Sequence, residues 1–159
     1  MKKLVLTLLC SCLLVGVFAQ KNLTSAQKSF QNSIITFLRE EGYSPSIDNN
    51  GWIAFKSEGK MFGIIIEKES PFFIIFRRSG FLVGGSDGFE YVFSLLACNK
   101  VNEDSRAVKM FCTKESVYLQ VEQYTRSAED FKYVFYQNLN VLTDAAKRFI
   151  EAYDEFEKK

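Results

Sequence analysis

The chain has 159 residues, of which 47% are hydrophobic and 25% are charged, and its formal net charge is +1. This length and composition are typical of one globular domain, and the near-zero charge predicts no surface for nucleic acid. The chain contains no histidine, which excludes Ser-His-Asp triads, Cys-His pairs and histidine metal sites. No cofactor motif is present.

Residues 1–19 have the pattern of a signal peptide. Two lysines precede an apolar run over residues 4–18, and Val17 and Ala19 supply the small residues of a cleavage site. The run is shorter than the ~20 residues that a membrane helix needs, although an uncleaved anchor is the alternative. We therefore expect export, either to a periplasm or as a secreted protein. The mature chain would be a single domain of residues 20–159 that has no membrane segment.

The end of this apolar run also resembles a bacterial lipobox, with Cys12 as the residue that would carry the lipid. Cys10, however, stands where a small residue is preferred, and apolar residues continue beyond Cys12. The sequence therefore favours a cleaved signal peptide over a lipoprotein.

Turn signals and a capping motif predict the first half of the domain. Thr24 to Gln27 form a capping-box pattern that begins a helix, and Gly42 ends it. Turn-forming residues then separate four extended segments, at residues 43–47, 52–56, 61–67 and 72–78. This spacing indicates an antiparallel meander of at least three strands.

The second half of the domain repeats these signals. Asp87 is expected to cap a second helix that runs to about Asn99, and two strands at 107–113 and 117–124 form a hairpin. Ser127 begins a third helix with a long apolar stripe. The predicted order is α-β-β-β(-β)-α-β-β-α. The fold class is therefore α+β, with three helices and an antiparallel sheet of about five to six strands.

The segment FLREEGYSPSIDNNGWIAFKSEGKMFGIII, residues 37–66, combines a helix ending in Gly-Tyr, an Asp-Asn-Gly turn and a Gly-containing hairpin. It resembles the YbjN-like branch of the type III secretion chaperone-like superfamily, whose element order matches nearly the whole mature chain. The resemblance implies a non-enzymatic, often dimeric domain that binds proteins or extended peptides. Secretion chaperones act in the cytoplasm, whereas export is expected here, so a role in type III secretion is not implied. No functional residue is transferred by motif.

The segment SPFFIIFRR, residues 70–78, is apolar on both faces of the strand that it predicts. The second helix likewise carries apolar residues on two sides. We expect a second copy of the chain or an extended peptide to cover this surplus, with Phe73, Ile75, Tyr91 and Leu95 as interface residues. The alternative is that helices of one chain cover both faces of the sheet.

Two pairs of residues have functional and structural interpretations. Cys98 and Cys112 could form a disulfide that stabilises the chain by about 3 kcal/mol, or they could be two buried apolar thiols. Arg77 and Arg78 could receive an acidic partner, or they could place one side chain on each face of the strand end.

The sequence thus predicts an exported, non-enzymatic binding module with a secretion chaperone-like fold. A structural protein that only forms homodimers is the second hypothesis, and an enzyme that uses carboxylates is the third.

Overall fold

The computed structural model describes residues 23–67, 73–78, 80–81 and 88–158, so the predicted signal peptide and Asp87 lie outside the described residues. The elements are α1 (Ser25–Glu40), β1 (Ser46–Ile47), β2 (Ile53–Ser57), β3 (Lys60–Ile66), β4 (Phe73–Arg78), α2 (Phe89–Asp104), β5 (Lys109–Cys112), β6 (Val117–Tyr124) and α3 (Ala128–Glu157). The predicted α+β fold class, with three helices and a six-stranded antiparallel sheet, is confirmed.

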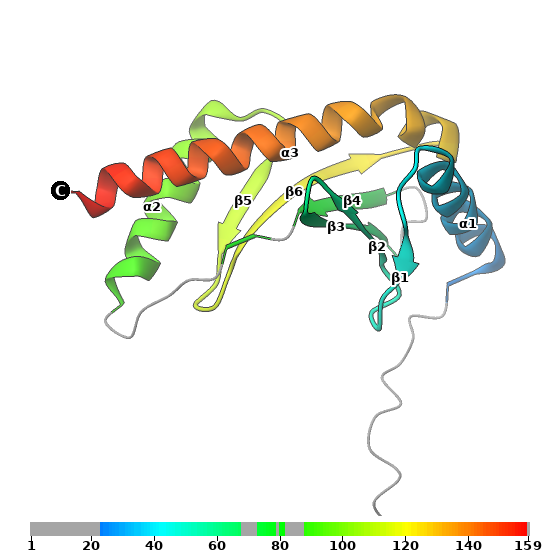
Figure 1. The fold of residues 1–159 in the computed structure, drawn as a ribbon, viewed down its shortest axis with the longest axis horizontal. Coiled ribbons are helices and arrows are strands. Elements are labelled where there is room, and N and C mark those ends of the chain that lie inside the picture. The colour runs from blue at the N-terminus through cyan, green and yellow to red at the C-terminus, as the bar shows by residue number, and fades with distance from the viewer. Residues whose placement is uncertain (1–22, 68–72, 79, 82–87, 159) are drawn as a thin grey trace, which may run out of the picture.

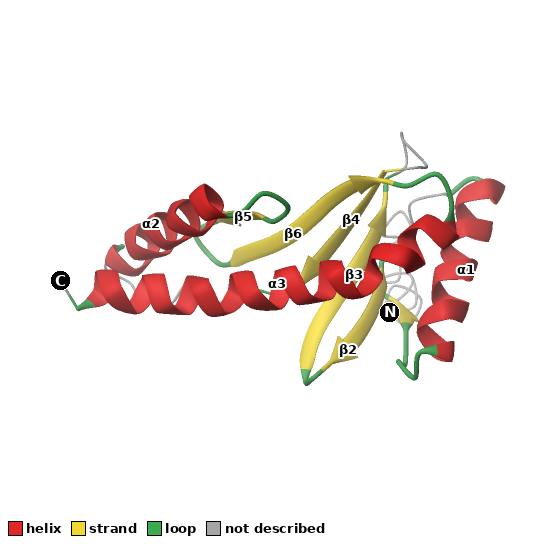
Figure 2. Ribbon diagram, turned by 90° about the horizontal axis from the view of Figure 1, so that it is seen from above, coloured by secondary structure: helices red, strands yellow, loops and turns green. Residues whose placement is uncertain are grey.

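The sheet has the strand order β1-β2-β3-β4-β6-β5, and each neighbouring pair is antiparallel. The long helix α3 runs across one face, with α1 at one end of the sheet and α2 at the other, beside β5 (Figure 1, Figure 2). We call this the helix-covered face. None of the described helices lies on the opposite side, which we call the helix-free face (Figure 1). No helix in the described part of the chain has the length and apolar character needed to cross a membrane.

Side-chain caps begin two of the three helices. In the capping box of α1 the Thr24 hydroxyl accepts a hydrogen bond from the Gln27 N–H at 3.3 Å, and the Gln27 side chain accepts one from the Thr24 N–H at 2.8 Å. At the start of α3 the Ser127 hydroxyl accepts a bond from the Asp130 N–H at 3.1 Å. These caps agree with the sequence pattern.

Helix α2 ends later than the sequence predicts, at Asp104 instead of about Asn99. Val101 is buried in the core, which holds the additional turn against the sheet. The Asn102 side chain accepts a bond from the Met110 N–H at 2.8 Å and donates one to the Met110 carbonyl at 2.9 Å. Two hydrogen bonds with Met110, a residue outside the helix, therefore stabilise a segment whose local sequence is polar.

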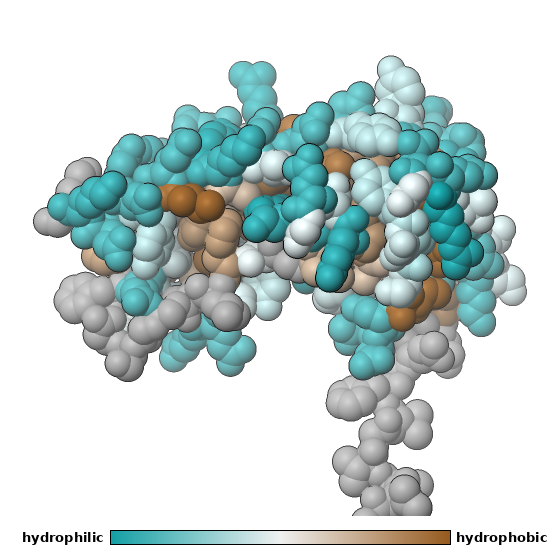
Figure 3. Space-filling view, viewed as in Figure 1, coloured by the Kyte–Doolittle hydropathy of each residue, from teal (hydrophilic) through white to brown (hydrophobic). Residues whose placement is uncertain are grey.

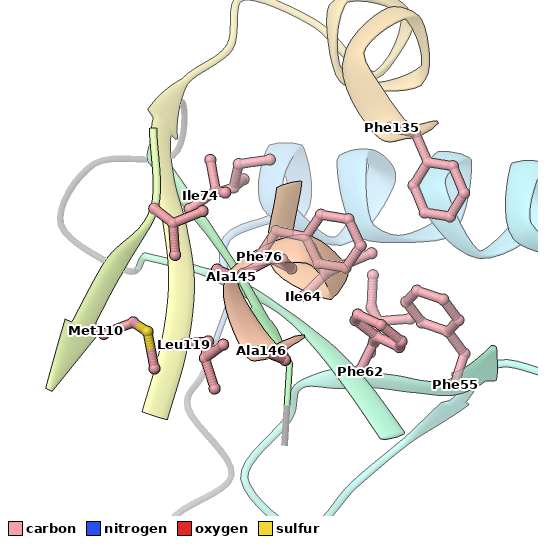
Figure 4. Packing of buried hydrophobic residues seen from close by; sticks show 14 of the residues in the cluster. Phe55, Phe62, Ile64, Ile74, Phe76, Met110, Leu119, Phe135, Ala145 and Ala146 are labelled. Carbon is pink, nitrogen blue, oxygen red and sulfur yellow. The ribbon is translucent and has the colours of Figure 1, made fainter. Parts of the chain in front are cut away.

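Phenylalanine rings fill the core between the sheet and α3 (Figure 4). Phe135 of α3 is fully buried, and its ring centroid lies 5.6 Å from that of Phe76 and 5.9 Å from that of Phe55. Phe37 of α1 contacts the same ring at 5.2 Å, in an edge-to-face arrangement. Phe135 thus joins α1, α3 and the sheet.

Strand β4 divides its side chains between the two faces. Ile74, Phe76 and Arg78 are buried on the helix-covered face, where Phe76 pairs with Ile64 and Val121. Ile75 and Arg77 alternate with them and lie on the helix-free face. The second apolar face of this strand is therefore not covered by a described helix, and other strands supply its neighbours.

Candidate functional site

Arg77 lies among three aromatic rings on the helix-free face. Its guanidinium carbon is 5.4 Å from the ring centroid of Trp52, 5.9 Å from that of Phe111 and 5.3 Å from that of Tyr118. Cations are attracted to the faces of aromatic rings at these distances. The rings come from the segment before β2, from β5 and from β6, so the group spans much of the sheet.

Small residues make room for the tryptophan. Ala54 and Gly63 are partners in the β2–β3 register, and Gly63 is also the partner of Arg77 on β4. A Cβ atom at Gly63 would lie 3.9 Å from Trp52 Cε3, which is ordinary van der Waals contact. The indole ring can therefore lie low over this part of the sheet, beside the arginine.

Hydrogen bonds fix the Arg77 side chain in place. Its Nε and Nη2 atoms donate to Gln120 Oε1 at 2.9 and 2.5 Å, and the Gln120 amide donates in turn to Glu122. Lys109 forms a salt bridge with Glu122 at 3.1 Å. Burial lowers the pKa of Arg77, while Tyr118 and Glu122 oppose this shift. We call Arg77, Trp52, Phe111, Tyr118 and Gln120 the Arg77 cluster.

The Arg77 cluster has the residue types of a binding surface. Its arginine and its three aromatic residues are half-buried in the chain alone, so each keeps part of its surface for a further contact. Trp, Tyr and Arg are the residues that most often dominate the free energy of protein–protein binding, because they combine large apolar area with a polar group.

The four interface residues predicted from the sequence lie on two different elements. Phe73 and Ile75 are on β4, and their register partners on β6 are Tyr124 and Glu122. Ile75 is half-buried on the helix-free face, opposite Ile65 of β3. Tyr91 and Leu95 are on α2, which packs mainly against α3 and β5. Ile75 therefore lies on the same face of the sheet as the Arg77 cluster, whereas Tyr91 and Leu95 belong to another part of the molecule.

Helix α2 buries a narrow stripe and exposes larger apolar residues. The buried residues are Ser94, Ala97, Cys98 and Val101, all small or medium in size. Leu95 is 36% exposed, and Val92 and Leu96 are 47% and 42% exposed. The helix therefore has an apolar outer side, as the sequence indicates.

Cys98 and Cys112 are free thiols in this structure. Burial raises the pKa of Cys98 to about 12, and the nearby Cys112 adds to this shift. Burial also raises the pKa of Cys112, although a hydrogen bond with Ser94 opposes it. Both thiols are therefore protonated near neutral pH and are poor nucleophiles.

Among the described residues, no three or more Cys, Asp or Glu side chains gather in a way that could hold a metal ion. A comparison with protein-family models found none that matches the chain, and a comparison with curated proteins found no match either.

Sequence reasoning missed most of the Arg77 cluster. The alternation over residues 117–124 places Tyr118 and Gln120 on the face opposite Leu119, and this signal could have found them. The alternation over the predicted segment 52–56 likewise places Trp52 on the face opposite Ile53. It does not show that Trp52 lies beside Arg77, because that depends on the strand register. Only the order of strands in the sheet brings Trp52 and the strands β4, β5 and β6 together.

Proposed function

We propose that this protein is a non-enzymatic binding module and that it binds another protein chain on the helix-free face of its sheet. The observation that carries the proposal is the Arg77 cluster, in which residue types common in binding hot spots meet on the face that no described helix covers. The surrounding apolar residue Ile75 enlarges this surface. Export before binding and the YbjN-like, secretion chaperone-like assignment are part of the same proposal.

The edges of the sheet favour docking on the face over addition of a strand. Edge strand β1 has two residues, and edge strand β5 has four residues with α2 beside it. Short edge strands offer few unpaired backbone groups, which disfavours the addition of a partner strand. We therefore propose that the partner contributes apolar and aromatic side chains that pack on the rings around Arg77.

Trp52 allows a direct test because it is the only tryptophan of the chain and belongs to the Arg77 cluster. Light scattering over a dilution series first gives the mass of the protein. Extended peptides from a display library are then titrated while tryptophan emission is recorded. Binding on the helix-free face should shift the emission to shorter wavelength, because the indole ring loses contact with water.

Two variants and a control decide where binding occurs. Tyr118→Ser and Arg77→Ser remove parts of the cluster, whereas Tyr133→Ser changes an 82% exposed tyrosine on α3. A partner on the helix-free face should bind at least about tenfold more weakly to the first two variants and equally well to the control. If the protein is a dimer that only the cluster variants dissociate, the partner is a second copy. Equal binding by all variants would contradict the proposal.

A further inference from the structure

A separate hollow of about 580 Å³ lies between the β2–β3 turn, the end of β4 and the middle of α3. The residues that form its apolar walls are Phe62, Phe81, Leu139, Ala146 and Ile150. Apolar side chains are visible beneath the hydrophilic row of α3 in the space-filling view (Figure 3). We call this hollow the Arg78 cleft, because the last residue of β4 lines it. It lies on the helix-covered side and is distinct from the Arg77 cluster.

Arg78 is a buried cation, and two of its nitrogen atoms have no hydrogen-bond partner among the described residues. Its side chain continues the inward alternation of β4 on the helix-covered face, and its register partners are Phe62 and Leu119. The residue is 7% exposed. Among the described residues, nothing accepts a hydrogen bond from its Nε or Nη1 atoms, and its guanidinium carbon lies 5.8 Å from the ring centroid of Phe81. Burial lowers the pKa of this side chain.

An arginine remains protonated near neutral pH even when its pKa is lowered, so Arg78 carries a positive charge. A buried charge without a partner costs free energy, because its hydration shell is lost and nothing replaces it. Proteins rarely leave such a donor unpaired. Arg78 lines the cleft, so a small polar group bound there would lie beside the guanidinium group.

The charges around the opening restrict the ligand. Lys60 and Lys147 line the cleft with Glu58 and Asp144, and Lys147 is 3.8 Å from Asp144 in a salt bridge. The two positive and two negative charges cancel, so Arg78 gives the cleft a net charge of about +1. One negative charge neutralises it, whereas a doubly charged phosphate would leave a second charge near two carboxylates. Phe62 and Phe81 favour a ligand whose remaining atoms are apolar.

We propose that the Arg78 cleft binds a monocarboxylate carried on an apolar body, with the carboxylate on the Arg78 guanidinium and the body against Phe62, Phe81 and Ile150. The carboxylate could belong to a free apolar acid or to the C-terminus of a peptide that ends in apolar residues. Both present the same chemistry to the arginine. This site adds a ligand class to the proposed function and does not depend on it.

The test measures binding to the full chain by isothermal titration calorimetry and by ligand-observed NMR. The probes are 4-phenylbutyrate and the tripeptide Leu-Leu-Phe with a free C-terminus, each with its amide as the uncharged control. One or both acids should bind with a dissociation constant of about 1 mM or lower. Each amide should bind at least about tenfold more weakly. Binding of only the first acid identifies a small-acid site, and binding of only the tripeptide identifies a C-terminal peptide site.

Arg126 provides a control for the arginine, because its side chain is 94% exposed and does not line the cleft. Arg78→Met should weaken the binding of either acid at least about tenfold, whereas Arg126→Met should leave it within about twofold. Ile150→Glu is a second variant that tests the same cleft without changing the core, because Ile150 is 47% exposed. Its added charge should repel the acids. The proposal is wrong if neither acid binds, or if the acids bind equally to the wild type and both cleft variants.

Discussion

Arg77 and Arg78 are consecutive residues of β4, yet their guanidinium groups lie on opposite faces of the sheet. Arg77 is held by Gln120 and three aromatic rings, whereas Arg78 has two donor atoms without a partner among the described residues. The alternation of a β-strand alone produces this difference. An arginine therefore belongs to a hydrogen-bonded surface cluster at position 77 and to the proposed ligand-binding cleft at position 78.

We expect the two arginines to affect stability in opposite directions. Arg78→Met should raise the free energy of unfolding by about 1–3 kcal/mol, because it removes buried donors that lack acceptors. Arg77→Met should lower it by about 1–2 kcal/mol, because it breaks the bonds to Gln120. Urea unfolding followed by circular dichroism measures both. A comparable loss of stability in the two variants would contradict this interpretation of Arg78.

Phe135 should be the most sensitive of the core positions that α3 contributes. Its ring is 0% exposed and meets rings of both α1 and the sheet. Phe135→Ala should lower the free energy of unfolding by about 3–5 kcal/mol, through lost burial and the cavity that remains. Tyr133→Ala, two residues earlier and exposed, should change it by less than about 0.5 kcal/mol. Similar values for the two variants would mean that α3 is placed wrongly on the sheet.

Tyr136 should lose its proton at a higher pH than an ordinary tyrosine. Its hydroxyl donates a hydrogen bond to Glu41, and this bond raises the pKa of Tyr136 to about 12. The folded chain thus retains the proton more strongly than the unfolded chain. Its contribution to stability is present below the ordinary pKa of 10.0 and is lost as the pH rises through about 12.

Ultraviolet absorbance of the phenolate, compared between the wild type and Tyr136→Phe, isolates this titration. Glu41→Gln should move the pKa of Tyr136 back toward its ordinary value, because the carboxylate that accepts the bond is gone. An unchanged titration in Glu41→Gln would show that the hydrogen bond between Tyr136 of α3 and Glu41, the residue that caps the C-terminus of α1, does not form in solution.

Cys98 should resist alkylation in the folded chain. It is buried, and its pKa near 12 leaves almost no thiolate at pH 8. Iodoacetamide should therefore modify Cys112 first, since Cys112 is only partly buried. Peptide mapping by mass spectrometry separates the two sites, and urea should make their rates similar. Equal rates without urea would mean that α2 opens readily.

Local signals in the sequence were enough to predict the helices, the strands and the fold class. The caps at Thr24 and Ser127 and the apolar stripe of α3 depend on residues within a few positions of one another, so they can be read without a structure. The end of α2 could not be read in this way, because Asn102 is held by Met110, which belongs to the next strand.

The sequence by itself determined the order of the elements, the absence of histidine and the two-sided apolar character of β4. Only the tertiary structure decided which face the helices cover and which residues share the other face. Trp52, Arg77 and Tyr118 are far apart in sequence, and the strand order β2-β3-β4-β6 alone brings them together. Alternation shows that neighbouring residues face opposite ways. Alternation does not show which face of the sheet is buried, because that depends on where the helices pack.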